Sequence, residues 1–103
     1  MELNDYQKLA QGTAVYPKTA TTDGLVYAVL ALCGEAGELA NKLKKHLRSG
    51  TPPDVMVLAD ETGDCLWYIS AICERLGLDL ETIADMNLEK LAERRAKNAI
   101  KEH

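Results

Sequence analysis

Hydrophobic residues along the chain recur at steps of three and four, which is the spacing of one face of an α-helix. The pattern predicts helices over residues 4–14, 23–48 and 54–76, and a fourth that starts near residue 79 and runs into a charged tail. No stretch alternates apolar and polar residues as a half-buried strand would. We therefore predict a single all-α domain over residues 1–103, built as a four-helix bundle.

Residues that favour helix ends support these boundaries. The expected N-terminal caps are Asn4 or Asp5, Asp23, Asp54 and Asp79. Gly50 and Gly77 are expected to end the second and third helices. Residues 16–22 are interpreted as a loop, because Pro17 interrupts the first helical pattern and threonines follow it.

Composition narrows the possible functions. The net charge of −4 argues against a nucleic-acid partner, which calls for a basic face. No apolar run approaches ~20 residues and no signal peptide is evident, so we expect a soluble cytoplasmic protein of a bacterium or a phage-infected host. Cys33, Cys65 and Cys73 lie in apolar helical stretches, which fits buried thiols in a reducing compartment. No Cys/His spacing resembles a zinc site.

Two pairs of acidic residues lie on the second and third predicted helices. Glu35 and Glu38 form one pair, and Glu61 and Asp64 form the other. Each pair has i, i+3 spacing, which places both carboxylates on one side of a helix. Glu61 falls within the apolar stripe, where a carboxylate without a partner is costly. If the four acids converge across two packed helices, a hard divalent cation such as Mg²⁺ would neutralise them.

The simpler interpretation is that both pairs are solvated helix surface, since acid pairs at this spacing are very common. The first pair could then bind neighbouring lysines. Three glycines argue against it: Gly34 immediately precedes the first pair, and Gly37 and Gly63 lie within the first and second pairs. Each glycine costs about 1 kcal/mol in a helix interior. Such glycines favour close approach of another helix or of a ligand.

A family resemblance adds to this interpretation. The text GEAGELANKLKK, followed by DETGDCLWYISAICERLGLDLETIADMNLEKLAERR, closely resembles the MazG-like all-α nucleoside triphosphate pyrophosphohydrolases. Their signature is ExxE, a spacer, ExxD, and then Asn and Lys on a later helix. The matching residues here are Glu35, Glu38, Glu61, Asp64, Asn87 and Lys90. The opening YQ and the TAVYP segment also resemble short phage and bacterial forms, so the resemblance covers nearly the whole chain.

The resemblance implies a reaction and a set of ligands. The family converts a nucleoside triphosphate and water into the monophosphate and pyrophosphate. The implied ligands of Mg²⁺, or of Mn²⁺ in its place, are Glu35, Glu38, Glu61 and Asp64. Glu38 is our choice for the general base that activates the attacking water.

Other residues are candidates for binding the substrate. Lys42, Lys45 and Lys90 would act as point charges on the phosphates, although solvated helix surface is the alternative. Asn87 lies near the apolar face of the fourth helix and would bind phosphate or sugar, or serve as an internal hydrogen-bond partner. Two aromatic residues follow Asp64 by three and four positions, and either could stack on the base or belong to the core. They are Trp67 and Tyr68.

Two other functions stay open. One is phosphoribosyl-ATP pyrophosphohydrolase, which shares the fold and the acid pattern. The GEAGE and GDxLWY text favours the nucleoside triphosphate pyrophosphohydrolase over it. The other is a non-catalytic helical module that binds a nucleotide or a partner protein. The presence of all four signature acids argues against this function. A di-iron bundle is excluded, because it needs Glu-x-x-His.

Self-association is also expected. Family members pair into dimers or dimers of dimers, and so short a chain leaves apolar residues to cover. Val26, Leu30 and Ile69 are examples. The expected partners are thus a nucleoside triphosphate and a second copy of the chain, with no nucleic acid and no membrane.

Overall fold

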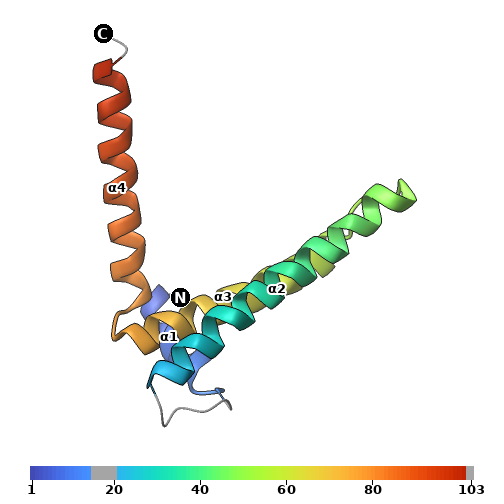
Figure 1. The fold of residues 1–103 in the computed structure, drawn as a ribbon, viewed down its shortest axis with the longest axis horizontal. Coiled ribbons are helices and arrows are strands. Elements are labelled where there is room, and N and C mark those ends of the chain that lie inside the picture. The colour runs from blue at the N-terminus through green and yellow to red at the C-terminus, as the bar shows by residue number, and fades with distance from the viewer. Residues whose placement is uncertain (15–20, 102–103) are drawn as a thin grey trace.

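The computed structural model describes residues 1–14 and 21–101, which form four α-helices (Figure 1). These are α1 (Leu3–Gln11), α2 (Thr21–Ser49), α3 (Val55–Leu76) and α4 (Leu80–Lys101). No strand occurs in these ranges, so the all-α prediction is confirmed for the described part of the chain.

α2 and α3 form a long antiparallel hairpin, which is the main packing unit of the chain (Figure 1). α2 ends before Gly50, whose φ is 72° and whose N–H donates to the carbonyl oxygen of His46 at 2.8 Å. Asp54 then caps α3, because its Oδ1 accepts the backbone N–H groups of Met56 and Val57 at 3.1 and 3.2 Å. Gly50 and Asp54 therefore end and start these helices as predicted.

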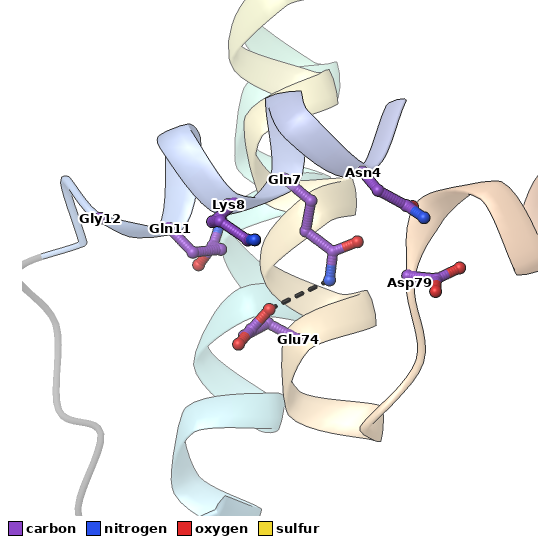
Figure 2. A pocket seen from close by; sticks show the side chains of 7 residues that line it. All are labelled: Asn4, Gln7, Lys8, Gln11, Gly12, Glu74 and Asp79. Atoms are coloured by element: carbon purple, nitrogen blue, oxygen red, sulfur yellow. Dashed lines mark hydrogen bonds between the residues drawn. The ribbon is translucent and has the colours of Figure 1, made fainter. Parts of the chain in front are cut away.

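α1 packs across the far end of α3 and holds the junction between α3 and α4. Gln7 is the central residue, with 6% of its surface exposed. Its Nε2 donates to Glu74 Oε2 at 3.0 Å and to the carbonyl oxygen of Leu78 at 3.1 Å. Its Oε1 accepts the backbone N–H of Leu80 at 2.7 Å. Figure 2 shows Gln7 pointing from α1 toward Glu74 on α3.

α4 points away from the hairpin, so the single chain does not close into the predicted four-helix bundle (Figure 1). Among the described residues, α4 contacts α1 and α3 and has no contact with α2. The chain changes direction at Gly77, whose φ of 71° ends α3 as predicted. Asp79 Oδ1 then accepts the backbone N–H of Thr82 at 2.8 Å, so the predicted cap of α4 is present. Gln7 also accepts the backbone N–H of Leu80, the first residue of α4, so side chains bound to the start of the helix help to fix its direction.

Two predicted helix starts are wrong. α1 begins at Leu3, with Glu2 at the N-cap position and no side-chain cap, so neither Asn4 nor Asp5 has that role. α2 begins at Thr21, which places Asp23 within its first turn, where a negative charge still favours the helix dipole. Residues 16–20 of the predicted loop lie outside the described residues.

The buried core of the single chain is small. Ala28 on α2 and Ala71 on α3 are fully buried where the two helices cross, and they form its centre. Ala14, Trp67 and Ile72 pack against them and are partly buried. Small residues at the centre allow the backbones of α2 and α3 to approach closely. The same contact fixes how the acidic residues of the two helices face one another.

Many large apolar side chains stay exposed on the hairpin and on α4. Val26, Leu30 and Ile69 are 51%, 66% and 37% exposed. On α4, Leu88 and Leu91 are 64% and 48% exposed. Large exposed apolar patches on a protein mark contact surfaces. None of the helices searched in the described residues is long and apolar enough to cross a membrane.

The cysteines differ in their environments. Cys73 is buried, and burial raises the pKa of its thiol above the ordinary value of 9.0. Cys65 is half-buried, whereas Cys33 is exposed on α2. The expectation of buried thiols is therefore wrong for Cys33, because its helical face is uncovered in the single chain.

Candidate active site

Three of the four acidic residues meet between α2 and α3. One carboxylate oxygen from each of Glu35, Glu61 and Asp64 lies within 4.8 Å of the other two. Glu35 comes from α2, and the other two come from successive turns of α3. The i, i+3 spacing on α3 and the packing of the hairpin thus create the cluster.

The cluster concentrates negative charge. Glu61 Oε2 is buried and has no hydrogen-bond partner. Burial, followed by the charges of Asp64 and Glu61, raises the pKa of Glu35 above the ordinary value of 4.5. A buried carboxylate oxygen without a donor, beside two more carboxylates, is costly unless a cation binds there. Oxygen ligands at this spacing suit a hard divalent cation.

Glu38 lies outside this cluster among the described residues. It is one turn beyond Glu35 on α2 and is exposed. It lines a separate surface pocket together with Lys42 and Lys45. The single chain therefore brings together three of the four predicted metal ligands and leaves Glu38 at the edge.

A cavity of about 300 Å³ lies beside the cluster and is lined by Glu35, Asp64, Trp67 and Tyr68. The two aromatic rings meet edge to face, with centroids 4.9 Å apart and planes at 79°. An aromatic wall beside carboxylates suits a ligand with one flat apolar part and one anionic part that is bound through a metal. The structure thus places both predicted aromatic residues next to the acids.

Two tyrosines that the sequence did not point to also interact with residues that line the cavity. Burial and then Tyr27, which hydrogen-bonds to Tyr68, raise the pKa of Tyr68 above the ordinary value of 10.0. Burial and then the charge of Asp64 raise the pKa of Tyr6 in the same direction. Tyr27 lies two turns before Glu35 on the same side of α2, so helical spacing could have found it. Tyr6 is on α1, and no signal in the sequence links it to the acids.

The predicted phosphate-binding residues lie away from the acid cluster. Lys42 and Lys45 line a cavity of about 260 Å³ at the tip of the hairpin. Asn87 and Lys90 line a pocket of about 250 Å³ on α4. Because α4 points away from the hairpin, one chain does not bring Asn87 and Lys90 to its own acids (Figure 1).

Comparison with known proteins identifies the family. Residues 27–99 match the family model described as the MazG nucleotide pyrophosphohydrolase domain. The chain belongs to the MazG family. Gene 37 protein of Mycobacterium phage L5 is 38% identical over 107 residues, which cover 97% of this chain and 94% of that protein. No solved structure is significantly similar to the chain.

The MazG match confirms the resemblance and covers both acid pairs. It includes the hairpin helices from residue 27 onward and most of α4. MazG domains are nucleotide pyrophosphohydrolases, and as a family they depend on a metal ion. The cluster of Glu35, Glu61 and Asp64 offers ligands for such an ion.

The raised pKa of Glu35 predicts how stability and metal binding depend on pH. A carboxyl whose folded-state pKa lies above its unfolded value stabilises the fold at low pH, and this contribution is lost as pH rises through the folded pKa. We therefore expect the metal-free protein to lose stability as Glu35 ionises. A divalent cation held by the cluster would favour its ionised form and should reverse this trend. Thermal unfolding in EDTA and in MgCl₂, from about pH 4 to about pH 7, should show a metal-induced rise in Tm that grows with pH.

Glu35→Gln is the matched control, because it keeps the side-chain shape and removes the titrating group. Its metal-induced change in Tm should be small and nearly independent of pH. If the metal-induced rise in Tm of the wild-type protein were equal at the lowest and the highest pH, the prediction would be contradicted.

Proposed function

We propose that the protein is a Mg²⁺-dependent nucleoside triphosphate pyrophosphohydrolase. It converts an NTP or a dNTP and water into the monophosphate and pyrophosphate. The observation that carries the proposal is the cluster of Glu35, Glu61 and Asp64 inside a MazG domain. Mn²⁺ is expected to substitute for Mg²⁺, because carboxylate ligands suit both ions.

The acidic residues would have two roles, metal binding and proton transfer. Glu35, Glu61 and Asp64 would hold Mg²⁺, which supplies charge neutralisation on the triphosphate and activation of a water. Glu38, one turn along α2 and outside the cluster, would act as the general base for the attacking water. Lys42 and Lys45, farther along the same helix, are the proposed contacts of the phosphate tail.

The aromatic residues would bind the base of the nucleotide. Trp67 and Tyr68 line the cavity together with Glu35 and Asp64, so a base between them would lie beside the metal-bound phosphates. Base–aromatic stacking contributes roughly 1–3 kcal/mol per base.

A second copy of the chain would complete the site. α4 carries Asn87 and Lys90 away from the acids of its own chain and leaves Leu88 exposed. A helix of 22 residues is about 33 Å long, which is enough to cross the hairpin of a neighbouring copy. Packing of α4 on that hairpin would cover apolar surface of both copies. It would also bring Asn87 and Lys90 to the partner's acids.

Product analysis tests the reaction. Purified protein is incubated with a panel of NTPs and dNTPs in MgCl₂, MnCl₂ or EDTA, and the products are separated by anion exchange. We expect the monophosphate and pyrophosphate with either metal ion and no turnover in EDTA. Light scattering on the same preparation should give the mass of at least two chains, and a monomeric active enzyme would overturn the shared site.

Each other outcome favours a different function. Diphosphate with free phosphate would keep the metal site and overturn the cleavage position. Turnover of phosphoribosyl-ATP alone would assign the protein to the related enzyme of histidine synthesis. No turnover of any of these substrates would favour a non-catalytic nucleotide-binding module.

A further inference from the structure

We propose that Thr13 is a positioning residue, which fixes the indole ring of Trp67 as the wall for the nucleobase. Trp67 Nε1–H donates a hydrogen bond to Thr13 Oγ1 at 3.1 Å, although the two residues are 54 positions apart. Thr13 Oγ1 in turn donates to the carbonyl oxygen of Ala10 at 2.7 Å. The inference rests on the proposed function, because it concerns the same cavity.

The two hydrogen bonds form a relay from the indole to the backbone of α1. Ala10 lies in the last turn of α1 and is buried, so the relay ends on a well-packed group. The hydroxyl of Thr13 accepts from one side and donates to the other, and bonds in such chains strengthen one another. A serine could reproduce both bonds, whereas an isosteric valine could make neither.

α1 also holds the backbone of Trp67. Ser70 Oγ donates to the carbonyl oxygen of Trp67 at 2.6 Å. Gln11 Nε2 on α1 donates to Ser70 Oγ at 2.8 Å and reaches the same carbonyl at 3.5 Å. The end of α1 thus secures both the main chain and the indole of Trp67, which leaves the ring one preferred orientation.

That orientation makes the ring a wall of the cavity. Trp67 packs against Ala28 and Ala71 of the core and lines the cavity with the acidic residues. Its N–H is used by Thr13, so the ring offers a ligand its apolar surface. Stacking on such a surface accepts any base, because every base has a π-face. Trp67 therefore favours nucleotides over ligands without a base and does not choose between bases.

The test compares a ligand that has a base with one that lacks it. Calorimetry in MgCl₂ measures the binding of an α,β-methylene NTP, which resists cleavage between the α- and β-phosphorus, and of inorganic tripolyphosphate. We expect Thr13→Val to weaken binding of the NTP analogue about three- to tenfold, since the neutral hydrogen bond that holds the indole is lost. Binding of tripolyphosphate should not change. Thr13→Ser should bind both ligands as the wild type does.

Fluorescence reports on the ring directly, because Trp67 is the only tryptophan. Thr13→Val should shift its emission to longer wavelength and increase quenching by acrylamide. Thr62→Val is the matched control. Thr62 is exposed and its Oγ1 donates to the carbonyl oxygen of Leu58 at 2.7 Å, so the same kind of helical bond is lost without any contact to the indole. Its emission should equal that of the wild type.

In turnover, Thr13→Val should raise KM for an NTP by a similar factor and leave kcat within about twofold. An equal loss for tripolyphosphate and NTP analogue, or no loss for either, would overturn the role of Thr13. If either result were found while the wild type still hydrolysed NTPs, the proposed function would stand without the role of Thr13. Binding that depends on Thr13, without any turnover, would overturn the proposed function and keep the positioning role. A wild type that binds no nucleotide would overturn both.

Discussion

Replacement of Glu61 by Gln is expected to abolish hydrolysis while the protein stays folded. Glu61 belongs to the acid cluster, and its buried Oε2 has no hydrogen-bond partner. Gln keeps the shape of the side chain but removes the negative charge of a proposed metal ligand. We expect kcat/KM to fall at least about a thousandfold, which corresponds to about 4 kcal/mol of transition-state stabilisation.

The stability of the variant separates loss of the metal from loss of the fold. In EDTA, Glu61→Gln should unfold at the same temperature as the wild type or higher, because one of three clustered charges is gone. In MgCl₂ it should lose the metal-induced rise in Tm. A variant that retains a tenth of the wild-type activity would rule out Glu61 as a ligand of the catalytic ion.

Asp60→Asn is the matched control for this experiment. Asp60 precedes Glu61 on α3, is exposed and lies outside the acid cluster. The substitution removes the same charge from the same helix, so it reproduces any general effect of charge on the protein. Its activity should stay close to that of the wild type.

The acid cluster was predictable because it depends on local periodicity. Spacing of i, i+3 places Glu61 and Asp64 on one side of α3, and the apolar stripe that contains Glu61 turns that side toward α2. The position of Glu38 was not predictable in the same way. Glu38 has the same spacing from Glu35, yet it is exposed and lies outside the cluster. Which member of such a pair faces the neighbouring helix depends on how the two helices pack, and the spacing alone does not determine it.

The course of α4 depends on contacts between residues far apart in the chain. Gln7 is 73 positions from Leu80, and Asn4 Oδ1 accepts the backbone N–H of Glu81, 77 positions away, at 3.1 Å. Amide side chains that bind backbone groups leave no pattern in the sequence, so the apolar stripe of α4 alone predicted a closed bundle. The side-chain bond from Trp67 to Thr13 also joins distant positions and leaves no periodic pattern, so it was not predicted.

Replacement of Gln7 by Leu should therefore destabilise the whole chain. Gln7 is buried and makes three hydrogen bonds, one of them with the N–H of Leu80. Leu fills a similar volume but leaves that buried N–H and the carbonyl of Leu78 without their partner. Loss of the bonds together with one unsatisfied buried donor should lower the free energy of unfolding by about 2–4 kcal/mol.

Urea unfolding at one fixed protein concentration measures this change, because self-association would make stability depend on concentration. Lys8→Leu is the control, since Lys8 is the exposed neighbour of Gln7 on α1 and gains the same side chain. It should stay within about 0.5 kcal/mol of the wild type. A loss below about 1 kcal/mol for Gln7→Leu would mean that water or other groups satisfy the junction. Gln7 would then not be the residue that directs α4 away from the hairpin.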